Sequence, residues 1–378
     1  LTQKKIETDE LLKNKNEEYR RKTAKEEKVY KKQMEQLENW FSAICNGFLN
    51  EDFVKNRLKE KGAWAFDFEH YFSHDRIKKI PSEIDLGTWW YSCEKNKINV
   101  KGYEQLLKYF MKFSEAVIKH NGYNMCFPFK RQTKSGLFFY LSMNTSEHRK
   151  YLRSLILANL MQYPAGKLNL VMIDPRTSSC FGGFARLGED DASMIDTSVW
   201  VNEYDICNAI SRLRARMSQL INEYGNEVEL CNQKEKHHLL VIADFPEGFN
   251  QRALDDLTII LEKGSSYGIN VIISQNDERM NHLQTSEKNY IDQIIKKMQV
   301  ISYYDQTYIT KVKADNGDLY QLEHKINQGF FEQNAIQIIN RVKEEMADQE
   351  QDAVEMEAVY QKSIKERALQ GNTLDGIR

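Results

Sequence analysis

The sequence lacks several features that would assign it directly to a functional class. No apolar run approaches the roughly 20 residues that cross a bilayer, so no segment is expected to span a membrane. The amino end is polar from Thr2 onward, which predicts no secretory signal. Lysine and arginine (53) nearly balance aspartate and glutamate (55), and the formal net charge of −2 gives no argument for nucleic-acid binding from the overall field.

Metal-binding spacings are also missing. The six cysteines are dispersed without a CxxC pair, which speaks against a zinc site and fits reduced, buried thiols in a cytosolic protein. His70 and His74 lie four residues apart, but no further ligands accompany them. We therefore predict no metal site in this chain.

A chain of 378 residues with 41% hydrophobic content is long enough for two domains. Residues 1–44 are predicted to form a charged helix, because Gly and Pro are absent before Trp40 and charges of both signs alternate. Five apolar residues then follow heptad spacing: Tyr30, Met34, Leu37, Phe41 and Ile44. This pattern predicts a coiled coil or a bracing helix, and a lone helix packed on its own domain is an equal alternative.

Residues 45–125 are rich in aromatics, including Trp89 and Trp90, and are interpreted as a mainly helical region. Their aromatics could form a partner surface, although a packed core is the preferred interpretation. Residues 334–370 are predicted to form a second charged helix. Its apolar stripe is Ile336, Ile339, Val342 and Met346.

The chain between these regions alternates apolar runs with amphipathic segments. The runs are 136–141, 168–174, 238–244, 269–275 and 299–304, and helices are expected between them, for example over 147–161 and 205–224. Short runs rich in Val, Ile and Phe between helices predict a parallel sheet covered on both faces. Three of the runs end in polar residues, at Ser142, Asp244 and Gln275, where such sheets bind ligands.

Six motifs in this region resemble the motor domain of the FtsK/SpoIIIE family of DNA translocases. They are SMNTSEHRKYLRSLIL (142–157), LNLVMIDPR, SRLRARMSQLINEYG, HLLVIADFPEGF, LEKGSSYGINVIISQN and INQGFFEQNAIQIINRVK. The first aligns without a gap with the family pattern GTTGSGKSxxLRTLIL. The resemblance implies an α/β domain over 126–333 with the RecA-like P-loop NTPase fold: a mostly parallel, helix-flanked sheet, with charged helices at both ends of the chain.

The same alignment implies a degenerate phosphate loop, or Walker A motif. Its positions are Asn144, Thr145, Ser146, Glu147, His148 and Arg149. Glu147 stands at the last glycine, His148 at the phosphate-binding lysine and Arg149 at the magnesium-binding Ser/Thr. A carboxylate would repel phosphate, a histidine is shorter than lysine, and arginine has no oxygen with which to coordinate a metal.

The other motor positions implied by the resemblance have changed as well. Ala243 replaces the magnesium-binding Asp of the Walker B strand, and Asp244 replaces the catalytic Glu. Ser265 stands where family members carry an arginine finger, whereas Gln275 is retained at the sensor strand. We therefore expect no catalytic residue and no bound cofactor in this chain. ATP and Mg²⁺ are expected in a neighbouring active domain.

Three functions are compatible with this interpretation. The first is an inactive structural, assembly or regulatory module of a larger DNA-translocase-like ATPase of the bacterial cytoplasm, in a ring such as a hexamer. The second is a module of a type VII-secretion-like ATPase that binds a protein substrate or regulates the motor, and the third binds nucleotide without hydrolysis. Expected partners are copies of itself, adjacent motor domains, and double-stranded DNA or a protein substrate. The start at Leu1 and the strand-like tail over 371–378 predict a fragment followed by a further domain.

Overall fold

The chain divides into two compact units in the computed structural model. The structure describes residues 13–29, 31–32, 35, 79–81, 83–92, 124–132, 136–140, 145–177, 181, 184, 199–313 and 319–346. The smaller unit comprises 1–64, 89–127 and 309–323, and the larger comprises 65–88, 128–308 and 324–378. The candidate site lies entirely within the larger unit.

The five apolar runs all form strands, as predicted. They are β3 (Leu137–Tyr140), β4 (Leu168–Ile173), β6 (His237–Phe245), β7 (Ile269–Gln275) and β8 (Gln299–Tyr304). Their side by side order is β8, β3, β7, β6, β4, and every neighbouring pair is parallel. A two-residue strand, β5 (Val199–Trp200), pairs with β4 at the edge. Counted along the chain, the order 5-1-4-3-2 is that of the RecA-like P-loop fold.

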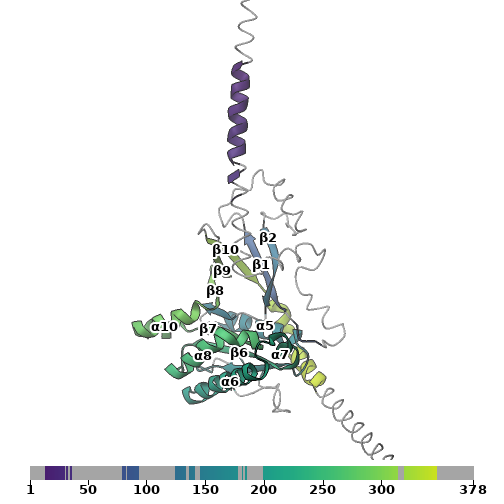
Figure 1. The fold of residues 1–378 in the computed structure, drawn as a ribbon, viewed down its shortest axis with the longest axis vertical. Coiled ribbons are helices and arrows are strands. Elements are labelled where there is room, and N and C mark those ends of the chain that lie inside the picture. The colour runs from purple at the N-terminus through teal and green to yellow at the C-terminus, as the bar shows by residue number, and fades with distance from the viewer. Residues whose placement is uncertain are drawn as a thin grey trace, which may run out of the picture. The chain divides into compact units, whose positions relative to one another are not determined.

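Helices cover both faces of this sheet (Figure 1). One face packs against α6 (Glu203–Tyr224), α8 (Gln251–Lys263) and α10 (Thr285–Ile295), through a core that includes Phe138, Ile242 and Ile273. The next residue along β3, Phe139, points to the opposite face and contacts Tyr151 of α5 (Ser146–Gln162), with ring centroids 5.6 Å apart. A helix over 328–346 is joined to α5 by the ion pair Arg153–Glu332 at 2.7 Å.

Side-chain caps start the helices that follow the strands. The Thr145 hydroxyl accepts the His148 N–H at the start of α5, and Asn202 and Asn250 do the same for the third residues of α6 and α8. Since these caps satisfy backbone donors at the carboxyl edge of the sheet, the chain turns from strand to helix there without a ligand.

The remaining described elements are short helical segments and further strands of the same ten-stranded sheet. They are β1 (Glu83–Ser92), β2 (Asn124–Gln132), α7 (Val228–Lys234), a 3-10 helix η2 (Gly264–Tyr267), α9 (Asp277–His282), β9 (Thr307–Lys313) and β10 (Leu319–Lys325). In that sheet β9, β10, β1 and β2 follow β8 in that order. Among the described residues, no helix is both long and apolar enough to span a membrane.

Two expectations differ from the structure. Residues 83–92 form a strand inside the region interpreted as mainly helical, because EIDLGTWWYS is rich in aromatics that favour strands. The predicted stripe of the last helix is partly wrong: Ile336 is 63% exposed, while Phe331, Ile338 and Ile339 are buried. The helix begins at 328, and its buried face includes Ile338 beside Ile339 and Met346, so Ile336 lies off that face. Residues 13–29 are helical and mostly exposed, whereas the heptad seam and His70 and His74 lie outside the described residues.

Candidate functional site

The predicted site lies at the carboxyl edge of the larger sheet. β7, which ends at Gln275, lies between β3, which leads toward α5, and β6, which carries Ala243 and Asp244. Residues 141–144 of the loop, Asn144 included, are outside the described part of the chain. The structure thus brings together the strand ends that the sequence predicts to carry the site.

The start of α5 is capped by its own residues. The Thr145 side chain accepts the backbone N–H of His148 at 3.2 Å, and the Thr145 carbonyl accepts that of Arg149 at 3.3 Å. Thr145, Ser146 and Glu147 are exposed. Glu147 is the acidic residue of the first turn, where a negative charge favours the helix dipole. One of the backbone donors at this helix start, the His148 N–H, is therefore already paired with a side chain.

His148 packs into a cluster of tyrosines. Its side chain is 6% exposed, and its ring lies edge-on to Tyr303 of β8, with centroids 4.5 Å apart. Tyr308 of β9 lies 6.2 Å from His148 and stacks on Tyr151 at 3.6 Å. Burial raises the pKa of Tyr303, and the neighbouring Glu147 carboxylate raises it further. His148 is thus part of a packed aromatic cluster.

A buried hydrogen-bond chain anchors this cluster to the sheet. The Tyr151 hydroxyl bonds Nδ1 of His324, and Nε2 of His324 lies 2.8 Å from the carbonyl oxygen of Leu86. A carbonyl can only accept, so Nε2 carries the proton and Nδ1 accepts from the tyrosine. Burial lowers the pKa of His324 to about 4, although the Leu86 carbonyl opposes this, so the ring is neutral.

Asp244 occupies an unusual backbone position at the end of β6. Its φ is +54°, in the left-handed region that disfavours residues other than glycine. The residue is 3% exposed, and its N–H points to the Ser274 hydroxyl at 3.4 Å. Burial and the Asp174 carboxylate raise the pKa of Asp244 to about 6, while Arg176 opposes the shift. Ala243 beside it is fully buried and offers no ligating atom.

Charged residues that the sequence analysis did not single out surround Asp244. Asp174 and Arg176 follow β4, and Arg176 forms an ion pair with Glu278 of α9 at 3.0 Å. Arg279 of α9 contacts Glu247, after β6, at 3.8 Å. Asp174 could have been found from sequence, because it ends an apolar run at the same edge as Asp244.

Gln275 and Ser265 lie at opposite ends of β7. Gln275 is buried at the carboxyl edge and donates from Nε2 to Asp277 at 2.8 Å, while its Oε1 is buried without a hydrogen-bond partner among the described residues. Ser265 lies in η2, just before β7 begins. The structure therefore does not bring Ser265 to the strand ends that carry the other candidate residues. No three His, Cys, Asp or Glu side chains in the described ranges converge into a group that could hold a metal ion.

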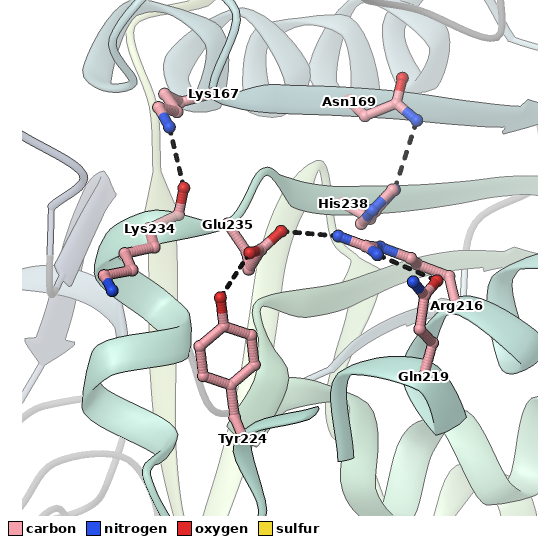
Figure 2. Close-up of polar contacts among 8 residues, drawn as sticks. All are labelled: Lys167, Asn169, Arg216, Gln219, Tyr224, Lys234, Glu235 and His238. Carbon is pink, nitrogen blue, oxygen red and sulfur yellow. Dashed lines mark hydrogen bonds and ion pairs between the residues drawn. The ribbon is translucent and has the colours of Figure 1, made fainter. Parts of the chain in front are cut away.

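The amino edge of the sheet has a separate polar cluster, shown in Figure 2. The Glu235 carboxylate accepts hydrogen bonds from Arg216 and from the Tyr224 hydroxyl, each at 2.6 Å. Both donors belong to α6, so Glu235 is held to this helix at two points. Beside it, the Asn169 amide donates to Nδ1 of His238 at 3.3 Å. Burial and then Arg216 lower the pKa of His238 to about 4. These contacts connect α6, β4 and β6 on the side opposite the candidate site.

No protein-family model matches the chain, and no curated protein matches it. Solved structures do resemble it. EssC (ATPases 2 and 3) from Geobacillus thermodenitrificans is 12% identical, with 73% of this chain and 51% of that chain covered and a TM-score of 0.45. EccC (ATPases 2 and 3) from Thermomonospora curvata, in complex with a signal sequence peptide, is 12% identical, with coverages of 60% and 45% and a TM-score of 0.39.

A third similar structure is the pCW3 conjugation coupling protein TcpA with ATPgS, which is 15% identical, with 57% of this chain and 66% of that chain covered and a TM-score of 0.36. The chain spans about half the length of the EssC and EccC structures. At these identities the likeness concerns the fold alone, which the strand order independently defines. In its fold, the chain is similar to parts of these solved structures.

Proposed function

We propose that this domain is a non-hydrolysing copy of the motor fold that serves as a structural, assembly or regulatory module of a larger DNA-translocase-like ATPase. The observation that carries the proposal is the position of His148. The side chain at the lysine position packs against Tyr303 and is 6% exposed. The His148 side chain therefore packs in the aromatic cluster and does not extend toward the position of a phosphate.

The start of α5 supports the same conclusion. A phosphate there would compete with the Thr145 hydroxyl for the His148 N–H. It would also approach the Glu147 carboxylate in the first helical turn, and like charges repel at this range. Both groups favour a helix start that carries no anionic ligand.

The residues at the metal positions do not fit Mg²⁺ with ATP. Arg149 and Ala243 offer no oxygen ligand from their side chains. Asp244 is one methylene shorter than the glutamate it replaces, and a misplacement of about 1 Å can cost roughly a hundredfold in rate. No hydrolytic step follows from this arrangement.

A module that has lost its site but kept its fold is suited to contacts with other domains. The five parallel strands and the helices on both faces are complete in the described residues. We infer that adjacent motor domains, or copies of this one, are its neighbours in a ring-forming assembly. Duplex DNA is the substrate we favour for that assembly. A protein substrate is the alternative, and the EccC structure with its signal sequence peptide is a precedent.

Calorimetry with ATP and ADP, with and without Mg²⁺, together with a phosphate-release assay, tests the loss of hydrolysis. We expect no Mg²⁺-dependent binding and no turnover above the buffer rate, with Asp244→Ala equal to the unmodified protein. A triple variant, Glu147→Gly, His148→Lys and Arg149→Ser, places the residues of the family pattern at the three altered loop positions and serves as the comparison. Saturable ATP binding with turnover that Asp244→Ala abolishes would overturn the proposal.

Fluorescence anisotropy with labelled duplex DNA separates the two substrate classes. DNA binding that falls about a thousandfold or more between 50 and 200 mM salt, as expected for several phosphate contacts, would support the DNA-translocase interpretation. Absence of DNA binding at low salt would instead favour a protein substrate. This measurement does not depend on the nucleotide result, so the two parts of the proposal can fail separately.

A further inference from the structure

The short helix α9 lies at the carboxyl edge of the sheet and packs on the core through the partly buried Met280. None of its six residues is buried. Its first turn is capped by Asn276, whose side-chain oxygen accepts the Arg279 N–H at 3.1 Å. An element with few buried contacts opens locally more readily than the core around it.

Two ion pairs connect α9 to the segments that follow the neighbouring strands. Arg176, after β4, binds Glu278 at 3.0 Å, and Glu247, after β6, binds Arg279 at 3.8 Å. All four side chains are at least 36% exposed. Each exposed ion pair of this kind shifts the equilibrium between docked and detached α9 by only about 1.4-fold to 5-fold. A change of charge nearby can therefore cancel the stabilisation that these pairs give to the docked helix.

Asp244 lies where such a change would act. The charged groups that face it are Asp174, Arg176, Glu247 and Glu278. Arg176 is shared, because it donates a hydrogen bond to Glu278 and is also attracted to Asp244. A charged Asp244 would compete with Glu278 for this guanidinium and would repel the Glu278 carboxylate.

We propose that α9 is a proton-controlled strap, which stays docked while Asp244 is protonated and detaches when Asp244 releases its proton to solvent. Detachment would expose the strand ends that carry Asp174 and Asp244, and Arg176 would then pair with those carboxylates. The strap acts whether or not the domain binds nucleotide, so it goes beyond the proposed function.

The direction of the pH effect follows from the buried carboxyl group. The pKa of Asp244 is raised to about 6 in the docked arrangement, chiefly by burial, and exposure to solvent would return it toward 3.8. The opening constant should therefore rise as the pH increases toward about 6 and level off above it. His282 is the histidine of α9 itself, so it needs its own control.

Amide hydrogen exchange of the peptide over 276–283, measured from pH 5 to pH 7 and corrected for intrinsic rates, tests the strap. We expect its opening constant to be at least about threefold higher at pH 7 than at pH 5. Asp244→Asn should remove this difference and keep the peptide protected, whereas His282→Asn should retain it. Peptides from α6 report whether each variant is folded.

Glu278→Gln, at an exposed position, is the second variant if Asp244→Asn fails to fold. It should raise α9 exchange at pH 5 by about 1.4-fold to 5-fold while leaving α6 protection unchanged. An α9 opening constant that is independent of pH would overturn the proposal. So would a pH dependence that survives in Asp244→Asn or disappears in His282→Asn, and so would a Glu278→Gln variant that exchanges like the unmodified protein.

Discussion

The Tyr151 hydroxyl donates a buried hydrogen bond to Nδ1 of His324, and this contact joins α5 to β10. Both side chains are buried, and the same histidine ring reaches the Leu86 carbonyl through Nε2. A close backbone approach accompanies the contact, since a Cβ atom added to Gly87 would lie 2.4 Å from the Lys325 carbonyl oxygen. Helix α5 is therefore held in place by a contact of one of its buried side chains.

Tyr151→Phe should destabilise the larger unit by about 1–3 kcal/mol, because Nδ1 of His324 would be left buried without a donor. Urea unfolding followed by circular dichroism measures the change. Tyr304→Phe is the matched control, since Tyr304 is 69% exposed and its hydroxyl loss should have little effect. Equal effects of the two substitutions would contradict the interpretation of the Tyr151 contact.

Stability should decrease as the pH falls from about 6.5 toward 4. His238 and His324 both have pKa values lowered to about 4 in the folded protein, so the unfolded chain binds more protons in this window. Their stabilisation is complete above 6.5 and is lost as the pH approaches 4, by up to about 3 kcal/mol for each histidine. Denaturant midpoints at half-unit pH intervals would reveal the trend, and His282→Asn, at an exposed position, should leave it unchanged.

Asp244→Asn should stabilise the domain at pH 7 by up to about 3 kcal/mol. The pKa of this carboxyl group is raised in the folded state to about 6, so its ionisation above that pH opposes folding. The gain should shrink as the pH falls below 6 and vanish below about 3.8, where both states are protonated. Thermal unfolding at pH 4, 5.5 and 7 checks this sign, and a loss of stability at pH 7 would contradict it.

Glu235→Gln should cost about 1–2 kcal/mol, because it weakens the contacts to both Arg216 and Tyr224 at the amino edge of the sheet. The comparison is Glu262→Gln, which affects the more exposed pair of Glu262 with Lys297 and should cost less than about 0.5 kcal/mol. Urea midpoints of the two variants provide the test. A larger effect at Glu262 would show that the Glu235 cluster contributes little to stability.

The five parallel strands could be predicted because short apolar runs such as HLLVIAD, placed between amphipathic segments, are typical of strands buried on both faces. The strand over 83–92 was interpreted differently, because its Trp-Trp pair lies within a mixed aromatic segment whose period favours no element clearly. Its neighbouring strand β10 is more than 200 residues away in the chain, so the pairing of the two strands could not be inferred from sequence.

The candidate site was predictable in part. The strand ends placed Asp244 and Gln275 at one edge, and the same rule, applied to 168–174, would have added Asp174. The tyrosines around His148 could not be identified, because Tyr303 and Tyr308 belong to a hairpin over 299–313 whose neighbour in space is set by the strand order. The sequence EHRK over 147–150 gives no sign that the side chain at 148 is the one that packs into the protein interior.

The enclosure of His148 changes what this position requires. In a working phosphate loop the residue is selected for a charge at a fixed reach, and no other side chain can replace it. Here the volume and flat ring of His148 fill the space beside Tyr303 and Tyr308. Aromatic and medium-sized apolar residues should therefore be accepted at position 148, and a survey of substitutions would find the constraint of a core position rather than that of a binding site.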